Sequence, residues 1–188
     1  MENFTSINTI QIVIGSWGSY NACNSKALGS KWLDLANYDT WEEIELELEK
    51  EGFDLNGIDE ELFIQDIDGF NTNDLNCDYM HPKRFFNLIK ESEVLENTYN
   101  YSIMEAFLEV KSFDEFEDRV NIYGSNWTDE IHLYQNFDWA DYGKEYFDMY
   151  GYELPSNLED FIDFEAYGQY IGSDYAEEFS NGIIEIIR

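Results

Sequence analysis

Carboxylates are the side chains of this sequence with the greatest capacity for chemistry. The 188 residues include 41 Asp and Glu against 10 Lys and Arg, which gives a formal net charge of −31. Suitably spaced carboxylates can ligate divalent cations, act in pairs as general acid and base, or stand in for phosphate groups against a basic protein surface. Each chemistry makes a different demand on spacing and on neighbouring residues.

Two stretches rich in Asp and Asn, 66–74 and 74–78, have the composition of calcium-binding loops. A loop of the EF-hand type needs Gly at its sixth position and a bidentate Glu at its twelfth. Counted from Asp66 the sixth residue is Asn71, and counted from Asp74 the twelfth is Phe85. We therefore expect no dedicated calcium site, although so many acids favour weak, adventitious binding of divalent cations.

The sequence carries no recognisable catalytic motif. His81 and His132 do not stand at metal-ligand spacing, and the zinc-protease, Cys-x-x-Cys, nucleophile-elbow, dinucleotide-binding and P-loop motifs are missing. Nothing singles out a catalytic pair among the acids, so a metal-independent glycosidase is kept only as a remote alternative. We expect a protein that is not an enzyme and that needs no metal or cofactor.

The composition is that of a folded chain. Hydrophobic residues make up 44% and aromatic residues 18% of the sequence, unlike most acidic disordered segments. Cys23 and Cys77 do not make a disulfide framework, and the first residues lack the basic and apolar parts of a secretory signal, so we expect a cytoplasmic location. Apolar runs are too short for a membrane span, and like charge would repel anionic membranes and nucleic acid.

The charge is large for a chain of this size. In duplex DNA the same number of phosphates would occupy about 53 Å of helix, whereas a compact globule of this length is only about 40 Å across. Self-repulsion on this scale disfavours a compact state, so we expect an elongated protein of small modules. Residues 32–78 hold 16 acids and one Lys, and residues 121–178 hold 14 acids and one Lys, whereas half of the basic residues lie between 81 and 120.

Apolar periodicity predicts an α+β fold in three modules, 1–80, 81–122 and 123–188. In the first module, we expect a small antiparallel sheet with strands at 10–14, around Trp32 and at 62–67, and turns at Gly18 and 21–24. Segment 41–51 fits both a helix and a strand. We favour a helix because Glu, Leu and Lys are strong helix formers, Thr40 can cap it and Gly52 can end it.

The central module is predicted to be helical. Pro82 suits a first helical position, and two capping boxes, Ser102–Glu105 and Ser112–Glu115, indicate two further helix starts. In the last, α+β module we expect a helix over 139–150 and a terminal strand over 182–187. A third capping box there is Ser156–Glu159, and the aromatic stripe Trp139, Tyr142 and Tyr146 is expected to be core.

A folded, acidic protein that has no catalytic or metal-binding motif is suited to bind one class of partner, a protein with a large basic groove. The sequence also resembles a known family, the ArdA antirestriction proteins. The resemblance is carried by an opening strand with an aromatic and Tyr-Asn turn (10–21), by Gly-Ser-Lys-Trp-Leu-Asp at 29–34, by 61–70, and by a Pro-containing segment at 154–168. Segment 169–174 departs from the family pattern.

The resemblance implies an elongated, three-part α+β protein that dimerises through its C-terminal part. Its curved acidic surface would imitate bent B-form DNA and occupy the DNA groove of the methyltransferase core of Type I restriction-modification enzymes, so that incoming mobile DNA is protected. Two alternatives remain. One is a DNA mimic aimed at a CRISPR effector, a nucleoid protein or a transcription factor, and the other is an acidic divalent-cation-binding protein.

If the protein mimics DNA, two sets of carboxylates are the candidates for imitating phosphates. A carboxylate that points into the fold cannot play this part. The first set is Glu42, Glu43, Glu45, Glu47, Glu49, Asp59, Glu60, Glu61, Asp66 and Asp68. The second set is Asp129, Glu130, Asp138, Asp141, Glu145, Asp148 and Glu153. Because such binding charge is distributed, we expect each single neutralisation to cost little.

Overall fold

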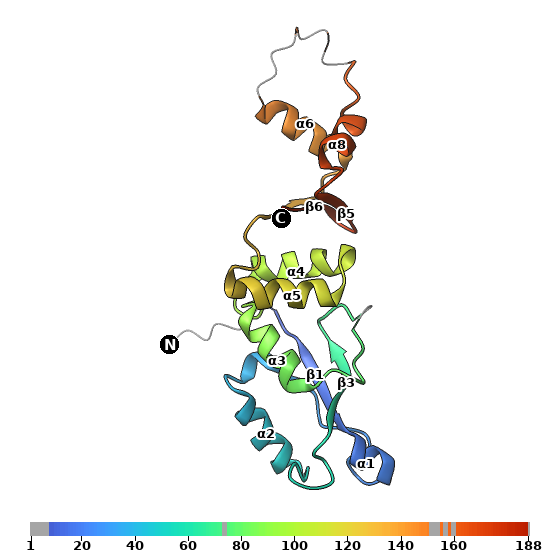
Figure 1. Ribbon diagram of the computed structural model, residues 1–188, viewed down its shortest axis with the longest axis vertical. Coiled ribbons are helices and arrows are strands. Elements are labelled where there is room, and N and C mark those ends of the chain that lie inside the picture. The colour runs from blue at the N-terminus through green and yellow to red at the C-terminus, as the bar shows by residue number, and fades with distance from the viewer. Residues whose placement is uncertain (1–7, 73–74, 151–154, 156–157, 159–160, 188) are drawn as a thin grey trace. The chain divides into compact units, whose positions relative to one another are not determined.

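The computed structural model describes residues 8–72, 75–150, 155, 158 and 161–187, and Figure 1 shows its elements. The fold is α+β, as predicted, with two small antiparallel sheets. The chain divides into two compact units. The N-terminal unit is Met1–Glu105 with Ser112–Trp127, and the C-terminal unit is Ala106–Lys111 with Thr128–Arg188. The division into three modules stays a prediction.

The N-terminal sheet contains β1 (Gln11–Ser16), β2 (Leu33–Asp34) and β3 (Leu62–Asp68), in the antiparallel order β2-β1-β3. The three predicted strands are thereby confirmed. β1 is buried and lies in the middle, and it extends through Gly15 to Ser16 because these residues pair with Phe63 and Leu62 of β3. The predicted turn at Gly18 is wrong: α1 (Trp17–Ala22) begins there, capped by the Ser16 side chain.

The acidic segment is a helix, α2 (Trp41–Lys50), as favoured from its composition. Thr40 and Glu43 form a capping box at its start, and Gly52, with φ +92°, follows its end. The buried face is Trp41, Ile44 and Leu48, at helical rather than strand spacing. Burial thus decides between the two periodicities that the sequence allowed. A short 3₁₀ helix, η1 (Leu35–Asn37), precedes α2.

Three helices follow: α3 (Pro82–Glu91), α4 (Thr98–Val110) and α5 (Phe113–Tyr123), then the 3₁₀ helix η2 (Gly124–Asn126). The helix start at Pro82 and the capping box at Ser112 are confirmed. The box at Ser102 is wrong, because α4 begins four residues earlier. The Asn97 side chain accepts hydrogen bonds from the backbone N–H groups of Tyr99 and Asn100 and supplies the cap.

The C-terminal unit packs α6 (Trp139–Met149) and α8 (Phe164–Gly172) with a sheet of β4 (Ile131–Gln135), β5 (Ala176–Phe179) and β6 (Gly182–Ile186) in the order β4-β6-β5. The predicted helix and terminal strand are confirmed, whereas β4, β5 and α8 were not anticipated. The aromatic stripe is core, with Tyr142 fully buried and Trp139 and Tyr146 packed around it. The capping box predicted at 156–159 lies outside the described residues.

Candidate partner-binding surface

Helix α2 buries Trp41, Ile44 and Leu48 and carries its acids on the rest of its surface, where Leu46 is exposed as well. Glu42, Glu43 and Glu49 are exposed, and Glu45 and Glu47 are half-buried. Glu43 closes the capping box by accepting a hydrogen bond from the backbone N–H of Thr40 at 3.4 Å. Glu45 accepts one from the indole N–H of Trp41 at 2.7 Å, so its carboxylate is held against the helix. The charges of this face are therefore carried on an ordered scaffold.

Glu47 differs from its neighbours because two lysines pair with it. Lys31 donates a hydrogen bond to its carboxylate, and Lys50 lies 3.1 Å away. These bonds, the one from Lys31 first, lower the pKa of Glu47, and the bond to Glu47 raises the pKa of Lys31. Glu47 thus contributes less net charge than the other acids of α2.

The remaining carboxylates of α2 approach the charge density of a nucleic-acid strand. Glu42 and Glu49 are separated by about 11 Å of helix axis, and four acids other than Glu47 lie within this span. The mean spacing is about 3.5 Å of axis per charge, near the 3.4 Å or so of one strand of B-DNA. Local geometry therefore suits this helix to a surface that binds phosphates.

Strand β3 and the loop before it continue the acidic surface of the N-terminal unit. Asp66 and Asp68 are both exposed, and being two residues apart on a strand they lie about 7 Å from each other on one face. Glu60 and Glu61, directly before β3, are exposed as well. Within the described residues, no Lys or Arg forms an ion pair with any of these four acids.

Asp59 does not belong to this surface, and the prediction that it is a phosphate stand-in is wrong. Its side chain is only 2% exposed, and it accepts hydrogen bonds from the Ser19 hydroxyl and, at 2.8 Å, from the backbone N–H of Asp54. Burial alone would raise the pKa of Asp59, but the bonds from Ser19, Ser16 and Asp54 outweigh it and lower the pKa. Asp59 holds the loop after α2 against α1.

In the C-terminal unit, the acids of α6 lie opposite its buried face. Asp141, Glu145 and Asp148 are exposed and follow one another at helical spacing, while Tyr142 and Gly143 are buried. Asp138 caps the helix by accepting from the backbone N–H of Asp141 at 2.9 Å. Asp129 and Glu130, just before β4, are exposed too. Glu153 lies outside the described residues.

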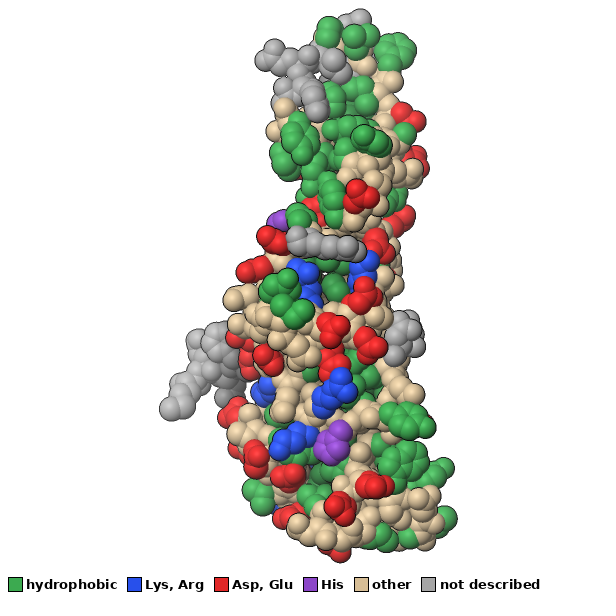
Figure 2. Space-filling view, in the orientation of Figure 1, with side chains coloured by type: hydrophobic (Ala, Val, Ile, Leu, Met, Phe, Trp, Pro, Cys, Tyr) green, Lys and Arg blue, Asp and Glu red, His purple; other side chains and the backbone are tan. Residues whose placement is uncertain are grey.

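Sequence reasoning missed several exposed acids that adjoin these sets. Asp39 precedes α2, Asp54 follows it, and Asp163 and Glu165 stand at the start of α8. The exposed position of Asp163 and Glu165 could have been predicted from the sequence, because acids are favoured at the start of a helix. Asp163 caps α8, and Glu165 lies in its first turn. Figure 2 shows acidic side chains on the visible face of each unit, interspersed with apolar and uncharged ones.

A second buried acid was not anticipated. Glu185, in the middle of the C-terminal sheet, is 1% exposed and accepts hydrogen bonds from the phenols of Tyr142, Tyr146 and, at 3.3 Å, Tyr134. Burial, followed by the interaction with Glu185, raises the pKa of Tyr134 to about 12. This carboxylate is enclosed by the fold and is unavailable to a partner.

The described part of the chain brings no catalytic constellation together. His81 caps α3 through its ring nitrogen, and His132 is exposed on β4. Across those residues, no cluster of three or more His, Cys, Asp or Glu side chains could hold a metal ion. No described helix is long and apolar enough to cross a membrane. Fold and surface together define the class: a small α+β protein that presents ordered carboxylates on both of its compact units.

The comparison with known families then identifies the chain. The sequence model of the family described as antirestriction protein (ArdA) matches residues 12–185, so this chain belongs to the ArdA antirestriction family. No curated protein sequence matches it. Membership makes the chain an inhibitor-type antirestriction protein, with restriction-modification enzymes as its class of partner.

Proposed function

We propose that this protein is a DNA mimic that occupies the DNA-binding groove of Type I restriction-modification enzymes, at their methyltransferase core. It would act in the cytoplasm and protect incoming mobile DNA. The observation that carries the proposal is the row of carboxylates on α2, whose spacing along the helix axis is close to that of phosphates on one DNA strand. Family membership supports restriction-modification enzymes as the target class.

The working residues are the exposed members of the two predicted sets. In the N-terminal unit they are carried by α2, β3 and the loop between them, and in the C-terminal unit by α6 and the segment before β4. Helices and strands hold these carboxylates in place before binding, which reduces the entropy lost on association. Like-charged DNA is excluded as a ligand, since the chain would repel it.

We also propose that the protein is a homodimer joined through its C-terminal unit. Large apolar side chains are exposed there, namely Met149, Tyr150, Phe161 and Tyr170, at 61% to 83%. Exposed apolar surface is a common feature of association sites. The N-terminal unit also exposes large apolar side chains, among them Leu28 and Tyr79, so the choice of the C-terminal unit follows the resemblance to the family. Sedimentation equilibrium tests this part, and a monomer at micromolar concentration would refute the dimer while leaving the groove-binding proposal intact.

The function is tested by adding the purified chain to a Type I enzyme and measuring DNA cleavage and DNA competition at several salt concentrations. We expect inhibition that is relieved by excess DNA and that weakens steeply as salt rises, because groove binding is largely electrostatic. Absence of binding to several Type I enzymes at low salt would refute the Type I target. Binding to another DNA-processing protein would instead favour a mimic with a different target.

A further inference from the structure

Helix α1 presents an exposed aromatic surface beside the loop that precedes β3. Tyr20 on this helix is 54% exposed, and Ile58 in the loop is 48% exposed. The helix lies directly on the loop, since a Cβ on Gly18 would be 1.7 Å from the Ile58 carbonyl oxygen. Figure 2 shows hydrophobic side chains gathered over the part of the N-terminal unit where Figure 1 places α1. The imitation of phosphates gives these side chains no part.

The rings are held in an ordered arrangement. Trp17 stacks on Phe63 of β3 with the ring centroids 4.3 Å apart, and it meets Tyr20 edge to face at 5.9 Å. The backbone N–H of Trp17 donates a hydrogen bond to the carbonyl of Glu61 at 3.0 Å. The bond from the hydroxyl of Ser19 to buried Asp59 fixes the helix to the same loop. The aromatic surface is therefore formed before any partner binds.

Exposed carboxylates lie on the loop that α1 contacts. Glu60 and Glu61 are both exposed, and in the part of the chain that the structure describes neither is ion-paired. Lys26, shortly after α1, has contacts elsewhere: its ammonium donates to the backbone oxygen of Glu51 and lies 5.5 Å from the centre of the Phe53 ring. The surface around α1 thus combines rings with negative charge that the described residues do not neutralise.

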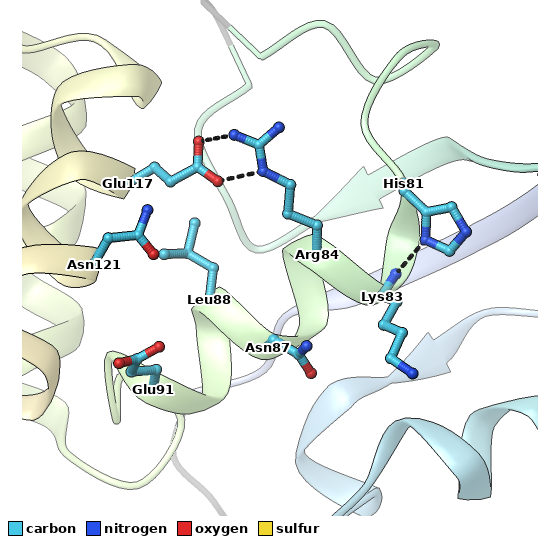
Figure 3. A pocket seen from close by; sticks show the side chains of 8 residues that line it. All are labelled: His81, Lys83, Arg84, Asn87, Leu88, Glu91, Glu117 and Asn121. Atoms are coloured by element: carbon cyan, nitrogen blue, oxygen red, sulfur yellow. Dashed lines mark hydrogen bonds and ion pairs between the residues drawn. The ribbon is translucent and has the colours of Figure 1, made fainter.

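The hollow beside α3 differs in this respect. It has a volume of about 540 Å³, and its lining mixes cations with acids (Figure 3). There the guanidinium of Arg84 binds both carboxylate oxygens of Glu117, so opposite charges are satisfied within the chain. For the acids beside α1, a cation supplied by another protein can take the place that Arg84 has in this pair.

Rings next to carboxylates select for a guanidinium group. A cation is attracted to the face of Trp or Tyr, and Arg is found there more often than Lys. The planar guanidinium can stack on a ring and donate hydrogen bonds to a carboxylate at the same time. A nucleic acid could stack its bases on Tyr20, but Glu60 and Glu61 would repel its phosphates. A second copy joined through the same surface would bring these carboxylates against their own counterparts.

We propose that Tyr20 and Trp17, with the neighbouring Glu60 and Glu61, bind an arginine side chain in the basic groove of the target enzyme. The inference rests on the proposed function and adds a contact that carboxylates alone do not provide. Charge attraction accepts Lys and Arg alike, whereas a ring face favours close contact with a planar group. Tyr and Trp are also frequent among the interface residues whose loss weakens binding most. Tyr20 thereby fixes where the acidic surface engages the groove.

The test compares variants of the full chain as inhibitors of a Type I enzyme. Tyr20→Leu removes the ring but keeps an apolar side chain, and Tyr20→Phe keeps the ring. Tyr99→Leu is the matched control, because Tyr99 on α4 is also 54% exposed. We expect half-inhibition of DNA cleavage to require about fivefold more of the Tyr20→Leu protein, the effect of losing one cation–π contact. Tyr20→Phe and Tyr99→Leu should inhibit like the unmodified chain.

A double-mutant cycle tests whether the ring and the carboxylates act on the same cation. In a chain that already carries Glu60→Gln and Glu61→Gln, Tyr20→Leu should weaken inhibition less than it does in the unmodified chain. The reason is that a guanidinium no longer held by the carboxylates makes a poorer contact with the ring. Strictly additive losses would overturn the shared site.

Thermal unfolding of each variant checks the fold, and a peptide measurement gives a readout that does not depend on any variant. The unmodified chain should bind an oligoarginine peptide more tightly than an oligolysine peptide of equal length, and Tyr20→Leu should reduce this preference. Absence of the preference in the unmodified chain would overturn the inference.

The enzyme assay separates this inference from the proposed function. If Tyr20→Leu inhibits as well as the unmodified chain, or if Tyr99→Leu loses as much, the inference fails while the proposed function stands. An equal loss in Tyr20→Phe would also overturn it, by assigning the contact to the hydroxyl group. An unmodified chain that does not bind the enzyme overturns both proposals.

Discussion

The carboxylate of Glu185 on β6 accepts a hydrogen bond from the phenol of Tyr142 on α6, and both side chains are buried. Tyr146, one helical turn later, donates to the same oxygen, and Tyr134 on β4 reaches the other. A buried carboxylate without a cation is costly unless its lone pairs are satisfied. Here three phenols satisfy it and join the helix to two strands of the C-terminal sheet.

This cluster predicts alkaline sensitivity of the C-terminal unit. Because the pKa of Tyr134 is raised from 10 to about 12, and burial raises the pKa of Tyr142 as well, the folded protein keeps protons that the unfolded chain releases. Stability should therefore be intact below about pH 10 and fall as the pH rises toward about 12. Urea unfolding across this range, followed by tryptophan fluorescence, measures it.

The control for this effect is an exposed tyrosine. Tyr142→Phe should be less stable at neutral pH and show a shallower fall at alkaline pH, whereas Tyr79→Phe should follow the unmodified chain. Equal pH slopes for all three proteins would show that general charge repulsion, and not the cluster, causes the alkaline loss.

Asp59 and Glu60 are adjacent in sequence and opposite in role. Asp59→Ala should destabilise the N-terminal unit by about 1–3 kcal/mol, because the Ser19 hydroxyl and the Asp54 N–H lose their acceptor. Since the pKa of Asp59 is lowered from 3.8, its contribution should be present above that value and decline as the pH falls below it. Glu60→Gln should change the free energy of unfolding by less than about 0.5 kcal/mol. Similar values for the two variants would contradict the assignment.

Gly143 on α6 and Gly168 on α8 mark a close helix crossing. A Cβ on Gly143 would lie 2.1 Å from the backbone oxygen of Phe164, and one on Gly168 would lie 2.1 Å from that of Trp139. Either Gly→Ala change should force the helices apart and cost roughly 1–3 kcal/mol of unfolding free energy. Gln169→Ala, at an exposed position of α8, should cost nothing measurable. Calorimetric unfolding compares them, and a stabilised Gly→Ala variant would refute the close crossing.

The placement of charge can be separated from its amount by two triple variants. The first neutralises Glu49, Asp66 and Asp68 on the proposed surface, and the second neutralises Glu96, Asp114 and Asp118, which are also exposed but belong to the central segment. Each single change should weaken inhibition of a Type I enzyme by less than about threefold, and the first triple by roughly tenfold or more. Equal losses for the two triples would mean that total charge, not its position, sets affinity.

Much of the local structure could be predicted from the sequence. The alternation around Ile12 and the helical spacing of Trp41, Ile44 and Leu48 identify β1 and α2 because burial of one face imposes a period on the chain. The start of α4 escaped prediction, since Ser102 has the pattern of a capping box but Asn97 provides the cap. A local motif does not tell which of two nearby capping residues the packed helix will use.

The sequence by itself determined the net charge, its concentration in two segments and the family pattern. Only the tertiary structure decided which carboxylates face solvent. Asp59 and Glu185 are enclosed by hydroxyl groups 40 and 43 residues away in sequence, from Ser19 and Tyr142. The fold likewise places Lys31, 16 residues away, against Glu47. The burial and pairing of a carboxylate depend on groups that packing brings together from distant parts of the chain. Such contacts cannot be predicted from local periodicity.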